Sequence, residues 1–153
     1  MLEWWVSVYA NHAVLRTAVA FAHIGGLVGG GGCAIAADYA TLALPREAVA
    51  ARAAHVQSIR RTHVIVVAGL VGLFLSGVLL LAADLETYLG SRVFWLKMAL
   101  IAALLINGVV LTRLGQRTVA RESGWDSLRR ASIVSIALWL LTTLLGAALP
   151  NIG

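Results

Sequence analysis

The sequence has little of what a water-soluble protein needs. Only 12% of its 153 residues are charged and 60% are hydrophobic, whereas a soluble domain carries roughly twice that share of charge. The single cysteine excludes an intramolecular disulfide and a multi-cysteine metal site. The motifs H-E-x-x-H and G-x-S-x-G, a phosphate-binding loop and paired carboxylates at catalytic spacing are also absent. A water-soluble monomer, a disordered chain and a secreted disulfide scaffold are thereby excluded.

In place of these features, the sequence has four long apolar runs, at 17–37, 64–83, 93–112 and 131–149. About 20 residues of helix cross a hydrocarbon layer of ~30 Å, so each run is long enough for one crossing. The runs are continuously apolar and do not alternate, which favours helices over a β-barrel. We therefore expect residues 1–153 to form a single all-α integral membrane domain, an antiparallel bundle of four transmembrane helices.

The basic residues indicate how this bundle is oriented. Nine of the twelve lie in two connections, at 45–62 and 113–130, and the positive-inside rule places both in the cytoplasm and both termini outside. We expect a multi-pass protein of the bacterial inner membrane. The pI near 10.4 then reflects topology, and nucleic-acid binding is excluded because the arginines are divided between two membrane-edge segments. These segments are expected to contact lipid headgroups or an acidic partner subunit.

The basic segments themselves are expected to be helical. Pro45 suits the first position of a helix, and the residues after it are rich in alanine and arginine. We therefore expect the first span to break near Leu44 and the chain to restart as a separate surface helix.

Ionisable groups inside a span are costly and usually face the interior of the bundle. At 100° per residue, His12, Arg16 and His23 share one face of the first span, and Asp38 lies about 60° to one side. We expect this polar stripe to face other helices. The interior polar residues are then His12, Arg16, Asp38 and Asn107. Asp38 is expected to pair at the cytoplasmic end with one of four candidates, His63, Arg60, Arg61 or Arg113. An unpaired carboxylate there is expensive, so we expect Asp38 to be bonded or protonated.

Glycine is concentrated in the first span, with two pairs at small-xxx-small spacing, Gly25/Gly29 and Gly26/Gly30. One interpretation is close helix packing, within the bundle or between two copies. A second is a flat surface cleared for a planar cofactor such as haem. A third is a locally unwound helix that lines a transport path, because four consecutive glycines weaken a helix.

His23 is the leading candidate for a cofactor ligand. With Gly26 and Gly30 beside it, His23 predicts a haem b-like site on an interhelical or intersubunit surface. His23 and His63 are also the candidate metal ligands, but their depths differ by roughly 10–15 Å. Two axial ligands of one haem must share a depth, so both cannot bind the same haem within one subunit.

Two routes to a second axial ligand remain. His23 of a second copy lies at the same depth across a twofold axis along the membrane normal, and Met98 on the third span lies near the depth of His23. Lys97 beside it is a candidate for holding an anionic ligand or a quinone headgroup. The alternative for Lys97 is snorkelling to the headgroups or pairing with Asp84 or Glu86.

Polar residues on the last two spans have the spacing of interhelical hydrogen bonds. Asn107 belongs to the third span. On the fourth span the residues expected to face inward are Ser132, Ser135, Trp139, Thr142, Thr143 and Gly146.

Several short stretches resemble an uncharacterised group of bacterial four-helix inner-membrane proteins that is distantly similar to the copper-resistance D membrane domain. They lie within residues 20–112 and include Ala22–Gly26, Ala37–Tyr39, Arg61–His63, Leu75–Leu80, Phe94–Met98 and Ile106–Gly108. The resemblance implies a four-helix membrane fold and no settled chemistry. Copper import needs clusters of Met and His, and the two methionines are isolated.

Three functions are compatible with these patterns. The first is a redox or electron-transfer membrane subunit that binds haem b or another planar cofactor at His23. The second is a non-catalytic accessory or assembly subunit of a larger membrane complex. The third is a small metal or ion transporter component that uses the polar stripe of the first span. We expect a homo-oligomer or partner membrane subunits in each case.

Overall fold

The structure, a computed structural model, describes residues 2–45, 49–121 and 124–152. These residues are helical apart from short connections and include no strand, which confirms the all-α expectation. Four helical stretches are long and apolar enough to cross a membrane, namely Ala13–Ala43, Ala50–Ala83, Arg92–Thr118 and Trp125–Asn151. The chain therefore has the helices of a multi-pass membrane protein.

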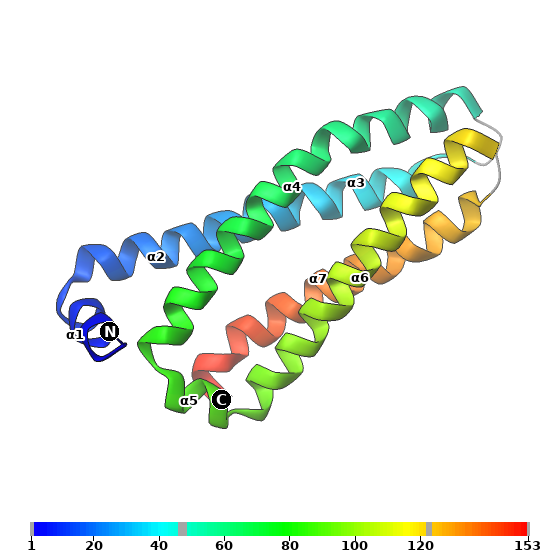
Figure 1. Cartoon of the computed structure of the whole chain (residues 1–153). Helices are drawn as coiled ribbons and strands as arrows, with labels where there is room; N and C mark the ends of the chain where they lie inside the picture. The colour runs from blue at the N-terminus through cyan, green and yellow to red at the C-terminus, as the bar shows by residue number, and fades with distance from the viewer. Residues whose placement is uncertain (1, 46–48, 122–123, 153) are drawn as a thin grey trace.

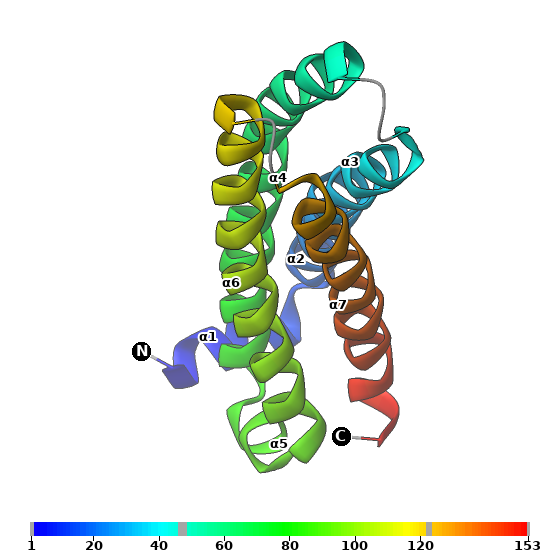
Figure 2. The ribbon, with the colours of Figure 1, turned by 90° about the vertical axis from the view of Figure 1, so that its right-hand side faces the viewer.

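In chain order the described elements are α1 (Leu2–Asn11), α2 (Ala13–Gly26), the π-helix η1 (Leu27–Gly31), α3 (Gly32–Ala43), α4 (Val49–Ala83), α5 (Leu85–Gly90), α6 (Arg92–Arg121) and α7 (Trp125–Ile152). The end of α3, the start of α4, the end of α6 and the start of α7 lie together at one end of the molecule (Figure 1). The short helices α1 and α5 lie at the other end. Figure 2 shows α1 lying across the axis of the long helices.

The helices extend well beyond the apolar runs. The basic segments are largely helical, as expected, because α4 begins at Val49 and because α6 and α7 cover most of 113–130. The prediction of a separate surface helix is wrong, since α4 continues without a break to Ala83. The break itself lies at Leu44, which is extended at ψ 131°, as a residue before a proline should be.

In one half of the bundle α2, η1 and α3 pack against α4, and in the other half α6 packs against α7. The backbones of η1 and α4 touch where the two helices cross. A Cβ atom added to Gly69 would lie 2.5 Å from Gly30 Cα, and one added to Gly26 would lie 2.8 Å from the Gly69 carbonyl oxygen. Close packing is therefore what Gly26 and Gly30 provide within the subunit.

The glycine run also changes the shape of the first span. Gly29–Gly32 overlap the π-helix η1, so the helix widens there without unwinding. A π-helical turn takes up about one residue more than an α-helical turn, and so α3 is rotated relative to α2. As a result α2 packs on α4, whereas α3 packs on both α4 and α7. The side chain of Trp139 in α7 lies against Gly31, where a Cβ atom would be 3.0 Å from the indole ring.

We predict that Gly69→Ala lowers the free energy of unfolding by about 1–3 kcal/mol, because the added methyl group has no room between the two backbones. Gly72→Ala on the same helix is the matched control, since its Cβ atom would meet nothing within 4 Å. The control should be neutral or slightly stabilising, because alanine is the better helix former. Thermal unfolding in detergent measures both, and equal losses in the two variants would contradict the close contact.

Candidate functional site

One polar cluster lies in the half of the bundle nearest α5 and takes a residue from each long helix. The imidazole Nδ1 of His23 in α2 is 3.0 Å from the Ser76 hydroxyl oxygen in α4. Lys97 of α6 lies close enough for its charge to act on His23. The Lys97 ammonium lies against Gly146 of α7, where a Cβ atom would be 3.3 Å from Nζ. His23 therefore faces another helix, in agreement with the expectation for its orientation.

The hydrogen bonds of Ser76 determine which nitrogen of His23 carries the proton. The Ser76 hydroxyl donates to the Gly72 carbonyl oxygen at 2.6 Å, with the Leu73 carbonyl oxygen at 3.2 Å. A hydroxyl has one proton to donate, so when that proton is in the 2.6 Å bond to Gly72, the Ser76 oxygen acts as the acceptor toward His23. His23 Nδ1 is then the donor, and Nε2 keeps its lone pair. This is the tautomer in which an imidazole can bind a metal ion through Nε2.

Lys97 has no carboxylate partner in the described part of the chain, since neither Asp84 nor Glu86 forms the ion pair that was considered for it. Asp84 instead accepts a hydrogen bond from the backbone N–H of Thr87 and caps α5. The Lys97 side chain is half-buried. It therefore brings a positive charge into the bundle beside His23.

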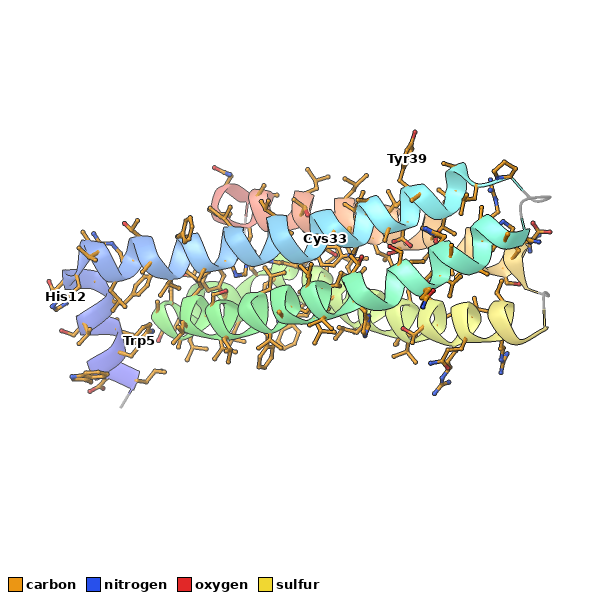
Figure 3. All side chains as sticks on the ribbon, turned by 90° about the horizontal axis from the view of Figure 1, so that it is seen from above. Trp5, His12, Cys33 and Tyr39 are labelled. Atoms are coloured by element: carbon orange, nitrogen blue, oxygen red, sulfur yellow. The ribbon has the colours of Figure 1, made fainter. Side chains whose placement is uncertain are left out.

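His12 and Arg16 are not interior residues, which corrects the expected polar stripe. Both are exposed, and His12 lies at the end of the molecule beside α1 (Figure 3). His12 Nδ1 donates to the Val8 carbonyl at 2.8 Å, and Arg16 donates to the carbonyls of Tyr9 and Ala10. The chain breaks between α1 and α2, so the last carbonyls of α1 need donors, and these two side chains supply them.

The other candidate ligands do not gather around His23. His63 is exposed on α4 and Met98 is half-buried on α6, and among the described residues no hydrogen bond or ion pair joins either to His23. Among the described residues no three His, Cys, Asp or Glu side chains form a group that could hold a metal ion. Gly26 and Gly30 are covered by α4, so a planar group cannot lie directly on them.

A second polar cluster lies toward the opposite end, between α3 and α7. Asp38 is 7% exposed, and its carboxyl group lies beside the hydroxyl groups of Ser135 and Ser132. The Ser132 hydroxyl has no hydrogen-bond partner of normal geometry. Asn107 joins α6 to α7 nearby by donating to the Ala131 carbonyl at 3.0 Å. Asn107 is therefore the interhelical link that its position predicted.

The partner expected for Asp38 is not one of the candidates whose side chains are described. His63 and Arg113 are both exposed, and neither pairs with Asp38. The side chains of Arg60 and Arg61, like all of Arg46, lie outside the described residues. The rotation of α3 at η1 explains the difference, because it turns Asp38 toward α7, which presents hydroxyl groups at this depth.

Three polar contacts at this end were not foreseen. Arg129 of α7 donates to the carbonyls of Leu42 and Leu44, at 2.7 and 3.2 Å, and so caps the end of α3. Thr41 and His55 join α3 to α4 at 2.8 Å. Arg52 of α4 lies over the Trp125 ring, 5.3 Å from its centroid. The sequence position of Arg129 could have indicated this contact, because a residue three positions before Ser132 lies on the same inward face of α7.

The end that carries α1 and α5 is tied together by aromatic side chains. Trp5 of α1 donates to the Leu79 carbonyl at 3.1 Å, and the ring of Tyr88 in α5 lies 6.2 Å from that of Phe94. Burial, followed by the charge of Asp84 and the neighbouring Tyr9, raises the pKa of Tyr88. Its phenol is therefore neutral throughout the physiological pH range.

Comparisons with family models, with curated proteins and with solved structures found no match to this chain. The resemblance to the copper-resistance D membrane domain therefore stays a prediction. What the two clusters do must be inferred from their own geometry and chemistry.

We predict that Arg129→Gln lowers the free energy of unfolding by about 1.5–3 kcal/mol, since hydrogen bonds from a charged group to the α3 carbonyls are lost. Arg130→Gln is the matched control, because Arg130 is the exposed neighbour on the same helix, and its effect should stay within about 0.5 kcal/mol. Unfolding in detergent measures both. Losses of similar size in the two variants would show that net charge, and not the cap on α3, is responsible.

Proposed function

We propose that the four long helices cross the bacterial inner membrane in alternating directions, as an antiparallel bundle with both termini outside. Arginines support this orientation, because they concentrate where α3 meets α4 and where α6 meets α7. The aromatic residues Trp5, Tyr9, Tyr88, Phe94 and Trp95 support it as well, since they gather at the end that carries α1 and α5.

Reporter fusions test this topology. Alkaline phosphatase is active only outside the inner membrane, so we expect a fusion after the last residue to be active and a fluorescent-protein fusion there to be dark. An insertion in the α3–α4 connection should give the reverse pattern. Fluorescence of the fusion at the C-terminus would contradict the proposed orientation.

We further propose that the protein is a redox or electron-transfer membrane subunit that binds a haem b-like cofactor through His23. The observation that carries this proposal is the Ser76–His23 hydrogen bond, which orients the imidazole and, with Nδ1 as the donor, leaves the Nε2 lone pair to bind a ligand. A metal-binding histidine usually has this kind of partner on its other nitrogen, which sets both the tautomer and the ring orientation.

The residues present fit a group that is bound through one imidazole. His23 would hold the cofactor through Nε2, Ser76 would hold the ring, and Lys97 would balance an anionic substituent of the cofactor. Bound haem would supply one-electron transfer. The His23 ring lies against Gly77 of α4, where a Cβ atom would be 3.6 Å from Cε1. A second protein ligand would come from a second copy or a partner subunit.

The absorption spectrum of the purified protein tests the cofactor proposal. We expect a Soret band that His23→Ala abolishes. Ser76→Ala should weaken cofactor affinity by about 10–100-fold, the usual effect of removing the partner of a metal-binding histidine.

His63→Ala is the matched control, because His63 is exposed on the same helix as Ser76, and it should leave the Soret band unchanged. Absorbance that depends on His63 but not on His23 would show that the ligand was assigned wrongly. A colourless protein that purifies with a larger membrane complex would favour an accessory subunit instead.

A further inference from the structure

Most of the described hydroxyl groups in the transmembrane helices of this protein follow one rule, and two of the three buried exceptions, Ser132 and Ser135 but not Thr142, lie beside Asp38. A serine or threonine in an apolar helix normally bonds back to the carbonyl four residues earlier. Here the hydroxyls that do so belong to Thr17, Thr41, Thr62, Ser76, Thr112, Thr118 and Thr143. Ser132 and Ser135 do not, although both are buried at 0% and 3% exposure. Both lie beside the Asp38 carboxyl group, and the Ser132 hydroxyl has no hydrogen-bond partner of normal geometry.

No positive charge among the described residues neutralises this carboxyl group. Arg129, the basic side chain on the same face of α7, donates to the carbonyls of Leu42 and Leu44. On α4, Arg52 lies over Trp125 and His55 is bonded to Thr41. An ionised carboxylate held only by two hydroxyls in a membrane interior is expensive.

A proton removes this cost with no further ligands. A metal cation would need more oxygen ligands than the three side chains supply, because hard cations in proteins take about six or more. We therefore propose that Asp38, Ser132 and Ser135 form a proton-binding site, in which the neutral carboxylic acid of Asp38 takes up and releases a proton between α3 and α7. The unpartnered Ser132 hydroxyl is then available to stabilise the carboxylate when the proton leaves.

Dicyclohexylcarbodiimide, an apolar reagent that enters membranes, tests the proposal. The O–H of a carboxylic acid adds across its C=N bond: the proton goes to nitrogen, the carboxyl oxygen bonds to carbon, and the adduct rearranges to a stable N-acylurea. An ionised carboxylate has no proton to give. At pH 7 only about one in 500 exposed glutamates is protonated.

In proteoliposomes at pH 7, we expect peptide mapping to find at least about ten-fold more label on Asp38 than on Asp84 and Glu86. These two acids are exposed near α5. Labelling of Asp38 should fall as the pH is raised and return when it is lowered again before the reagent is added. An unlabelled Asp38 at pH 7 would overturn the proposal.

Two variants connect the labelling to the cluster. Asp38→Asn should remove the label at this peptide. The double variant Ser132→Ala with Ser135→Ala should stay labelled to higher pH than the wild type, because the hydroxyls that stabilise the carboxylate are gone. Thr142→Ala is the matched control: Thr142 is another buried hydroxyl of α7 without a contact to Asp38, so labelling should not change.

Sodium ions provide the opposing test. If 100 mM sodium chloride suppressed labelling and the same concentration of choline chloride did not, the cluster would bind a cation, and the proton proposal would be wrong. Since the mapping uses the wild-type chain, this result does not depend on how well Asp38→Asn folds. The Soret band assigned to His23 should be unaffected by the reagent, which keeps the two proposals separable.

Discussion

The contact between Gly30 and Gly69 is the constraint on which the interior of this bundle depends. In lipid, apolar side chains gain little by leaving their surroundings, so helices associate through close packing and hydrogen bonds. With no side chain between them, the backbones of η1 and α4 touch. This closeness brings His23 within hydrogen-bonding distance of Ser76 on the same pair of helices. It also leaves the opposite side of η1 open to Trp139, which packs α7 against Gly31.

The polar interior is consequently divided into two levels. His23, Ser76 and Lys97 lie on the α5 side of the glycine crossing, and Asp38, Ser132 and Ser135 lie on the other side. Trp139, 4% exposed, follows Ser135 on α7 and packs against Gly31 at the glycine crossing. Each level takes residues from different helices, so neither cluster exists until the helices pack.

Structural features that depend on hydropathy and segment length were predicted correctly from the sequence. Helix content, four spans and the inward position of Asn107 follow from local composition and spacing. Partners were harder to predict, because they depend on how each helix is rotated. A count of 100° per residue runs straight through Gly29–Gly32, whereas the chain takes a π-helical turn there, and Asp38 meets serines instead of a basic residue. His12 and Arg16 were misplaced for a related reason: the chain breaks before Ala13, and the same count assumed one continuous helix.

The π-helix gives the first span a spare residue. About one extra residue in the turn corresponds to a rotation of roughly 100° of the second half of the span, relative to a regular α-helix of the same sequence. Loss of one glycine from Gly29–Gly32 would leave hydropathy and span length almost unchanged. It would remove the residue that the wide turn takes up, restore a regular α-helix and leave Asp38 facing α7. A one-residue deletion here is therefore compensated by loss of the π-helical turn, and the helical phase of the second half of the span is kept.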